Sequence, residues 1–496
     1  MKLSSLINKP KRLVLITGLC LSVAGIGSAN AQEEETLLNT LPRYSAKKPF
    51  KTLTFPQLRK GKHIYQGTVK CGWNIGCEMP ELRKVPRATQ TTWDKGFNPI
   101  IARQLDLLLD EIITQDGKPG VVIRVDMGRQ SWRGVAGTSR IEECCGNKPR
   151  VFSDKFRIGS ITKMVMASVV VALAQEGRLN LDDTMEKWFS DESWYSQMPN
   201  GNLITVRDLL RHQSGLADYV PFDNFVCNSL TRIKPESLLI PAFKQGSQFE
   251  PGNGWLYSNT NYILVGLLIE KVTKKPVAKA LNHHLLIPLK AFNTVFPSEA
   301  AIPYYYASGY MNLAGHLDSN GNCIHDQTTS FRDTTFIDPS LPWTAGGVIS
   351  NVNDLTEIVK GQVMGTYPKL SPAFQKERFQ FVYTGTDTPK TGRIYYALGM
   401  YDIKGYRGHI GQVPGYGSAA YYHQEQKIAI VINMNSYSGD PGKKTSTDIF
   451  LEILDILDGK WDQQARRELS LLPDGRTHHQ AILGVKPEHK DRLMLR

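Results

Sequence analysis

The sequence predicts an α+β fold, in which an antiparallel sheet flanked by helices forms an α/β sandwich and carries an all-helical subdomain. Two observations predict this fold. Hairpin patterns occur near both ends of the central part of the chain, each beside a segment with helical periodicity, and further helical segments fill the interval between them. We therefore expect a functional site in the cleft between the sheet and the helical subdomain.

The first half of the sheet begins with a helix at residues 99–115, where apolar side chains recur at helical spacing. Apolar residues then alternate over residues 121–125 and 131–136, on either side of Met127-Gly128-Arg129. Alternation across a turn that contains glycine is typical of a hairpin. This order predicts one helix packed on the first two strands.

The second half of the sheet is predicted near the other end of the chain. Residues 417–423 and 427–433 form the second hairpin pattern, and an apolar helix follows at residues 448–457. Each end of the central part of the chain thus has a hairpin beside a helix. This arrangement favours two hairpins that belong to one sheet.

Three helices are predicted in the interval between the hairpins. They cover residues 161–176, 205–212 and 261–272. The second of them has Thr205 and Asp208 at the spacing of a capping box, in which two side chains and two backbone N–H groups satisfy each other. We find no internal repeat in the chain.

The N-terminus has the pattern of a secretory signal. Basic residues precede an apolar run at residues 13–26, and Ala29-Asn30-Ala31 offers a cleavage site before a polar segment. The run is short for a membrane span, and an uncleaved anchor is the alternative. Residues 1–31 are therefore expected to be removed from an exported protein, either periplasmic or secreted.

Three parts follow the predicted signal. Residues 32–95 form a polar extension, residues 96–458 form a folded domain with its helical subdomain at about 160–340, and residues 459–496 form a tail. The extension has 12 basic and 6 acidic residues. Contact with anionic envelope components is one hypothesis for it, and ordinary solvated surface is the other. Export and the lack of a recognition motif argue against a nucleic-acid partner.

Six cysteines remain after the signal, an even number that suggests disulfides in an exported protein. A zinc site is disfavoured, because the sequence lacks C-x-x-C and H-E-x-x-H patterns, and His283-His284 is expected on a helix surface. No metal or other cofactor is expected. The candidate disulfide pairs, among fifteen connectivities, are Cys71 with Cys77, Cys227 with Cys323, and the vicinal Cys144 with Cys145.

The first chemical motif is Ser160-Ile161-Thr162-Lys163, which opens a helix that is apolar almost all round and therefore expected to be buried. A spacing of three residues puts the Ser160 hydroxyl and the Lys163 amine on one helix face. A desolvated lysine has a lowered pKa and serves as a base toward a nearby hydroxyl. A second S-x-x-K, Ser45-Ala46-Lys47-Lys48, has no buried helix after it, so context selects Ser160.

The second motif is Tyr257-Ser258-Asn259, directly before another apolar helix. A tyrosine beside a lysine ammonium gives up its proton more readily and relays it to a leaving group. Asn259 offers a donor and an acceptor to a substrate amide. Tyr310-Met311-Asn312 has the same spacing, but no strong helix follows it.

The third motif is His409-Ile410-Gly411, followed by Gln412 and the second hairpin. An edge strand here would supply a backbone N–H to an oxyanion hole, with Gly411 allowing close approach of substrate. His409 is expected to polarise a substrate carboxylate or to join proton transfer, and a purely structural histidine is the alternative.

These motifs in this order resemble the serine β-lactamase and penicillin-binding-protein superfamily, in the branch of class C β-lactamases, D-Ala-D-Ala carboxypeptidases, D-aminopeptidases and esterases. The resemblance covers residues 99–457 and includes the segments 206–216, 251–276 and 345–350. It implies a β-lactamase/transpeptidase-like fold.

The resemblance also implies roles for the motif residues. Ser160 would be the acylated nucleophile, and Lys163 and Tyr257 would be the proton-transfer pair. The oxyanion hole would consist of the N–H groups of Ser160 and Gln412. The residues implied to bind substrate are Asn259, His409, Gly411 and Gln412.

One position departs from the family pattern. Class C β-lactamases carry lysine where this chain has His409, whereas some D-peptidases and esterases of the branch carry histidine there, so efficient penicillinase activity is in doubt. A literal Lys390-Thr391-Gly392 occurs earlier in the chain and is better interpreted as a turn. Ser214 is a rival nucleophile that we interpret as the end of the capped helix, and no G-x-S-x-G elbow occurs.

The sequence therefore predicts an exported serine hydrolase that cleaves an amide or ester bond through an acyl-enzyme on Ser160. The candidate substrates are D-Ala peptides of cell-wall origin, β-lactams and small esters. The alternative is a catalytically weak envelope-binding or scaffolding protein on the same fold.

Overall fold

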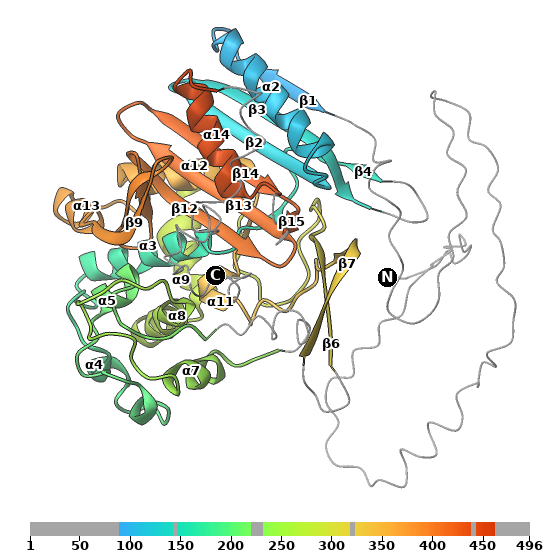
Figure 1. The fold of residues 1–496 in the computed structure, drawn as a ribbon. Coiled ribbons are helices and arrows are strands. Elements are labelled where there is room, and N and C mark those ends of the chain that lie inside the picture. Colours follow the sequence, from blue (N-terminus) through green and yellow to red (C-terminus); the bar gives the residue numbers. More distant parts are fainter. Residues whose placement is uncertain (1–88, 142–146, 220–231, 318–322, 438–442, 462–496) are drawn as a thin grey trace, which may run out of the picture. The chain divides into compact units, whose positions relative to one another are not determined.

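The computed structural model describes residues 89–141, 147–219, 232–317, 323–437 and 443–461 (Figure 1). Within these ranges no helix is both long enough and apolar enough to cross a membrane. The predicted signal, most of the extension and most of the tail lie outside the described residues, as do the cysteines proposed for disulfides, apart from Cys323. At Cys323 only the backbone is described.

The centre of the fold is an antiparallel sheet whose strands come from both ends of the described chain. Its order is β1-β3-β2-β14-β13-β12-β11-β10-β9, and β4 (Lys148–Pro149) pairs with β3. Pairing of β2 with β14, for example Val125 opposite Ile430, joins the two predicted hairpins. The strands are β1 (Gln90–Trp93), β2 (Gly120–Met127), β3 (Gln130–Arg140), β9 (Val382–Thr388), β10 (Gly392–Tyr396), β11 (Tyr401–Ile403), β12 (Tyr406–Val413), β13 (Tyr416–His423) and β14 (Ile428–Met434).

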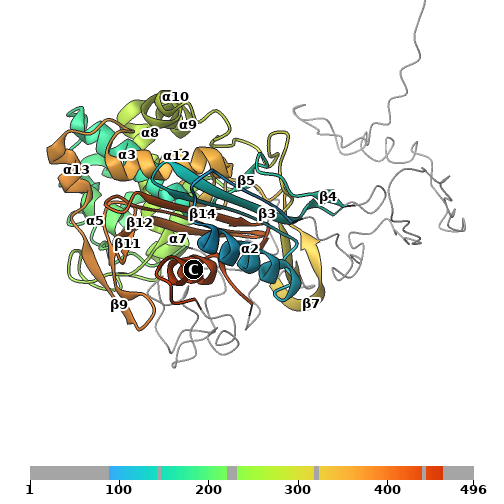
Figure 2. The ribbon, with the colours of Figure 1, turned by 90° about the horizontal axis from the view of Figure 1, so that it is seen from above.

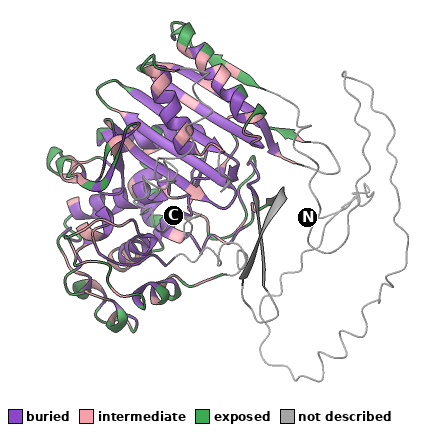
Figure 3. Cartoon of the chain, in the orientation of Figure 1, coloured by how far each residue is buried: buried purple, intermediate pink, exposed green. Residues whose placement is uncertain are grey.

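Helices cover both faces of this sheet (Figure 2). On one face α2 (Pro99–Thr114) and α14 (Ser446–Leu457) bury their apolar sides in one core cluster. On the other face α3 (Ile161–Gln175) and α12 (Val352–Met364) belong to a second, larger cluster. Removal of both sheet faces from water supplies the main driving force for folding, and the central strands, purple in Figure 3, are mostly buried, as is α3. The predicted α/β sandwich is confirmed.

The predicted helices lie between the two halves of the sheet, and the described chain also contains strands outside the main sheet. The hairpin of β6 (Tyr310–Leu317) and β7 (Cys323–Asp333) had no signal in the periodicity, and β15 (Ser436–Tyr437) runs parallel to β6. Strands β5 (Phe156–Arg157) and β8 (Ile349–Ser350) pair with each other. The remaining helical segments are α4 (Met185–Phe189), η2 (Tyr195–Gln197), α5 (Val206–Arg211), α7 (Pro235–Phe243), α8 (Asn259–Thr273), α9 (Val277–Leu281), the π-helical η3 (Asn282–Leu286), α10 (Ile287–Leu289), α11 (Trp343–Gly346) and α13 (Pro372–Arg378).

Local hydrogen bonds explain where the helices near the site begin. The capping box of α5 is present, because Thr205 Oγ1 accepts the Asp208 N–H at 3.1 Å and the Thr205 N–H donates to Asp208 Oδ2 at 2.9 Å. Helix α8 begins at Asn259, two residues before the predicted start. Its first N–H donates to the carboxylate of Asp218 at 3.2 Å, a cap supplied from 41 residues away.

Candidate active site

Ser160 lies at the start of α3, on a backbone that the helix holds in place. Every residue of this helix from Ile161 to Ala174 is buried. Gly159 has a φ of +56°, which glycine adopts without strain, and it turns the chain from β5 into the helix. Ser160 itself is only half-buried, so its hydroxyl stays accessible.

Strand β12 approaches the start of α3 at backbone contact distance. A Cβ on Gly411 would lie 1.9 Å from the Ile158 carbonyl oxygen, and a Cβ on Gly159 would lie 2.6 Å from the Gln412 nitrogen. Only glycine fits at either position. The contact brings the N–H of Gln412 close to that of Ser160. We expected Gly411 to admit substrate, and in the structure it admits the turn that carries the nucleophile.

The same strand has an edge that no neighbouring strand covers. It pairs with β13 from Tyr406 to Val413, but with β11 only at Tyr406, Arg407 and Gly408. On the β11 side, residues 409–413 are therefore unpaired by any described strand. Such an edge offers main-chain groups to an extended ligand.

The Lys163 amine has no exposed surface and three hydrogen-bond partners. Its Nζ lies 3.0 Å from Ser160 Oγ, 2.6 Å from Asn259 Oδ1 and 2.8 Å from the Ala345 carbonyl oxygen. Burial lowers the pKa of Lys163 to about 7, against the opposing charge of Asp218. Near neutral pH the uncharged amine is therefore well populated.

The partners of Lys163 determine what its neutral form does. A neutral amine has two N–H donors and one lone pair. Asn259 Oδ1 and the Ala345 carbonyl oxygen only accept, so they take the two donors and leave the lone pair for the Ser160 hydroxyl. This is the arrangement of a general base beside a nucleophile.

Asn259 is itself oriented by Asp218. The Asn259 Nδ2 donates to Asp218 Oδ2 at 2.9 Å. Because a carboxylate accepts and does not donate, this bond directs the oxygen of the carboxamide toward Lys163. Both ends of the Asn259 side chain are thus engaged within the protein, and in this structure it positions Lys163.

Tyr257 places its ring beside the Lys163 amine, with 4.8 Å between the ring centroid and Nζ. Its hydroxyl is buried, and the polar group that interacts with it is the side chain of Ser160. Burial raises the pKa of Tyr257 well above its ordinary value, and the Ser160 side chain is the main opposing influence. We expected the lysine to ease proton loss from Tyr257. Burial outweighs that influence, so Tyr257 is a protonated phenol and Lys163 is the better base.

His409 lies behind Tyr257, with 6.2 Å between their ring centroids and no exposed surface. Its Nε2 lies 3.0 Å from Tyr396 Oη, and its Nδ1 contacts the carbonyl oxygen of Ile410. These contacts place the imidazole inside the core. A substrate carboxylate would have to displace buried groups to reach it.

A second buried imidazole supports Tyr257 from the side of α5. The ring centroids of His212 and Tyr257 are 4.3 Å apart, and His212 Nδ1 accepts the N–H of Ser258 at 3.2 Å. Burial, followed by the charges of Lys163 and His409, lowers the pKa of His212 well below its ordinary value. His212 is therefore neutral and holds the segment that carries Tyr257 and Asn259.

The rival motifs are engaged in other contacts. Tyr310 Oη accepts a backbone N–H at 2.7 Å, and Lys390, in the turn between β9 and β10, lies 3.8 Å from Asp455 of α14. Ser214 is buried and donates to Asn261 Oδ1 at 2.6 Å. Ser45 lies outside the described residues.

Several residues of this site were not singled out from the sequence: Asp218, Ala345, His212 and Tyr396. Their contacts join segments far apart in the chain, and Ala345 contributes only a carbonyl oxygen. The one sequence signal for Asp218 was an acidic residue so close after the capped helix. The structure shows that it is buried. In the ranges that the structure describes, no group of three His, Cys, Asp or Glu side chains has the arrangement of a metal site.

The chain is similar in sequence to several known proteins. The sequence profile of the Beta-lactamase family matches residues 105–452. Protein flp of Staphylococcus aureus is 28% identical over 213 residues, which are 42% of this chain and 41% of that protein. Penicillin-binding protein 4* of Bacillus subtilis is 25% identical over 197 residues, 39% of this chain and 42% of that protein. The matches thus span about two fifths of these relatives.

Among solved structures, a D-stereospecific amidohydrolase from Streptomyces sp. is 29% identical, with a TM-score of 0.58. The alignment covers 71% of this chain and 97% of that one. The similarity therefore includes nearly the whole of the solved protein.

Proposed function

This chain belongs to the Beta-lactamase family and is a serine hydrolase, and from that premise we propose that it cleaves an amide or ester of a D-amino acid through an acyl-enzyme on Ser160. We further propose that it is exported, as its first 31 residues suggest. One observation carries the proposed chemistry: the buried Lys163 amine has a lone pair for the Ser160 hydroxyl, 3.0 Å away.

The proposed acylation uses the groups already in place. Lys163 takes the proton of the Ser160 hydroxyl as Oγ bonds to the substrate carbonyl carbon. The negative charge that develops on the carbonyl oxygen is accepted by the N–H groups of Ser160 and Gln412. Tyr257, a protonated phenol, gives its proton to the departing nitrogen or oxygen as that bond breaks, and the Lys163 ammonium restores it. Water then attacks the acyl carbon and gives a proton to the neutral Lys163 amine, which returns that proton to Ser160 Oγ as the ester bond breaks.

The surroundings of His409 support substrates without a free carboxylate beside the bond that breaks. Its imidazole is fully buried and bonded to Tyr396, so no exposed cation stands at the position where class C β-lactamases carry lysine. The name of the Streptomyces amidohydrolase agrees with an amide of a D-amino acid. We therefore place D-amino acid amides and esters ahead of D-Ala-D-Ala peptides and penicillins.

Covalent labelling tests the nucleophile. A fluorophosphonate and a fluorescent penicillin are incubated with the protein, and the intact mass is measured. We expect one fluorophosphonate adduct per chain that disappears in Ser160→Ala and persists in Ser45→Ala, the matched variant of the second S-x-x-K. An adduct that survives Ser160→Ala, or no adduct with either reagent, contradicts the assignment and favours the scaffolding alternative.

A substrate panel tests the specificity. It contains D-alanine amide, L-alanine amide, a D-Ala-D-Ala peptide, nitrocefin and a p-nitrophenyl ester. We expect kcat/KM to be highest for the D-amide or the ester, and Ser160→Ala to abolish all turnover. A preference for the D-Ala-D-Ala peptide or nitrocefin contradicts the proposed role of the His409 surroundings, while leaving the nucleophile intact.

A further inference from the structure

The two helices that begin at the active site end together at a second hollow. Helix α3 carries Ser160 and Lys163 at its start, and α8 begins with Asn259. Each has 15 residues, so their far ends lie roughly 22 Å from the site. Between those ends and α9 is a pocket of about 300 Å³, lined by Arg178, Thr273, Lys275, Lys279, Ala280, His283 and His284.

The lining of this pocket is rich in cations and contains no carboxylate. Lys275 and Lys279 are exposed, and in the described part of the chain neither amine forms an ion pair or a side-chain hydrogen bond. Three permanent positive charges surround one small space. Glu176, just outside the lining, lies 3.9 Å from Arg178, but among the described residues neither lysine has such a partner, so an anion placed between the cations gains attraction from each.

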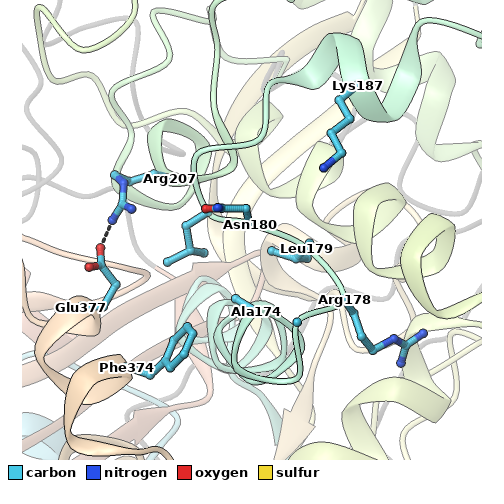
Figure 4. Close-up of a pocket in the computed structure, with 10 residues that line it drawn as sticks. Ala174, Arg178, Leu179, Asn180, Lys187, Arg207, Phe374 and Glu377 are labelled. Atoms are coloured by element: carbon cyan, nitrogen blue, oxygen red, sulfur yellow. Dashed lines mark ion pairs between the residues drawn. The ribbon is translucent and has the colours of Figure 1, made fainter.

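In the adjoining hollow, drawn in Figure 4, Arg207 forms an ion pair with Glu377. The hollow has a volume of about 500 Å³ and shares Arg178 with the smaller pocket. Its Lys187 pairs with Asp183 at 2.7 Å. The Arg178 side chain extends away from the Arg207–Glu377 pair. The smaller pocket differs in having two lysines, Lys275 and Lys279, that form no ion pair within the described ranges.

Two groups at the pocket have partners that an anion would not need to displace. Arg178 donates to the carbonyl oxygen of Val272 at 2.7 Å and lies 3.9 Å from Glu176, and His284 Nδ1 lies 3.3 Å from the same carboxylate. The His284 side chain is only 7% exposed, and it lies in the π-helical turn η3, a geometry found often at functional sites. Burial lowers the pKa of His284; Glu176 opposes this effect, whereas His283 and Arg178 add to it.

Helix ends alone do not account for this lining. The C-terminal ends of α3 and α8 carry partial negative charge, which favours nearby cations. This effect accounts for Arg178, which donates a hydrogen bond to the Val272 carbonyl oxygen in the last turn of α8. Lys279 lies in the last turn of α9, and within the described residues its amine forms no ion pair or hydrogen bond, so its charge is available to a ligand.

We propose that this pocket is a binding site for a phosphate group, held by Lys275, Lys279 and Arg178 at the end of the helix pair that starts at the active site. A volume near the lower limit of ligand pockets fits a small phosphate ester or a single headgroup. Two lysines and an arginine match the charge of a phosphate better than that of one carboxylate.

Titration of the full chain with inorganic phosphate tests the proposal, with the imidazole NMR signals of His283 and His284 as the readout. We expect a saturable shift of both signals, a rise in the pKa of His284, and weaker binding as NaCl increases. Lys275→Gln/Lys279→Gln should weaken binding at least about tenfold, because it removes two of the three permanent charges. Lys187→Gln, in the adjoining hollow, is the matched control and should leave the affinity unchanged.

The source of the phosphate is distinguished by two further arms. Glycerol 3-phosphate represents a soluble ester, and vesicles of phosphatidylglycerol, with phosphatidylcholine as the control, represent a lipid headgroup. The fluorophosphonate adduct on Ser160 confirms that each variant is folded, and Lys279→Gln alone replaces the double variant should that one not fold. No saturable shift with phosphate, an equal shift with acetate, or unchanged affinity in the lysine variants overturns the proposal.

Discussion

The pH dependence of acylation follows from the burial of Lys163. Burial disfavours the ammonium form and lowers the pKa of this amine to about 7, so the neutral form that accepts the Ser160 proton increases as the pH rises. With a single titration at about 7, the neutral fraction is about one eleventh at pH 6 and about ten elevenths at pH 8. The rate constant of acylation should therefore increase about tenfold between these values.

The assay is stopped-flow labelling with a fluorophosphonate or a p-nitrophenyl ester under single-turnover conditions, from pH 5.5 to 9.0. Lys163→Arg is the control, since its guanidinium keeps its charge over this range and should lower the rate by about 10²- to 10⁴-fold. Asp218→Asn removes the charge that favours the ammonium, so its midpoint should move to lower pH. A flat profile, a midpoint near the ordinary lysine value, or full activity in Lys163→Arg would refute the assignment of Lys163 as the base.

Three further predictions concern the surroundings of Ser160. Gly411→Ala places a Cβ 1.9 Å from the Ile158 carbonyl oxygen. We therefore expect a loss of about 1–3 kcal/mol in unfolding free energy and weaker labelling of Ser160. An unchanged Tm would contradict this expectation. Tyr257→Phe removes the proposed proton donor, so kcat for an amide should decrease by about 10²- to 10⁴-fold and much less for a p-nitrophenyl ester, whose leaving group needs no proton; equal losses would argue against this role. Thr205→Ala removes a cap 3.1 Å from the Asp208 N–H and should cost about 1 kcal/mol in urea denaturation, with kcat/KM retained.

Most of the fold was predictable because its signals are local. Alternation across Met127-Gly128-Arg129 and helical spacing at residues 99–115 predicted β2, β3 and α2 to within a few residues of the ends. The β6–β7 hairpin lacked such a signal. Its strands are polar and mixed in composition, so neither period dominates.

The residue types of the candidate site could be predicted from the sequence, but most contacts between those residues could not. Ser160 and Lys163 share a helix face, so their proximity follows from spacing alone. The bond of Lys163 to the Ala345 carbonyl spans 182 residues and involves no side chain of Ala345. The protonated state of Tyr257 depends on how deeply the folded chain buries its hydroxyl. The identity of the residue alone does not predict that burial.

The contact between Gly411 and the turn at Ile158 has a consequence for how this enzyme can vary. The proposed oxyanion donors are main-chain N–H groups, one of them from Gln412, whose side chain is half-buried. Substitution of that side chain leaves the N–H in place. A library of variants at position 412 should therefore retain acylation while its members diverge in substrate preference, and a library at position 411 should yield glycine almost alone. The main chain thus sets the positions of the oxyanion donors, and the side chain at position 412 can vary without moving them.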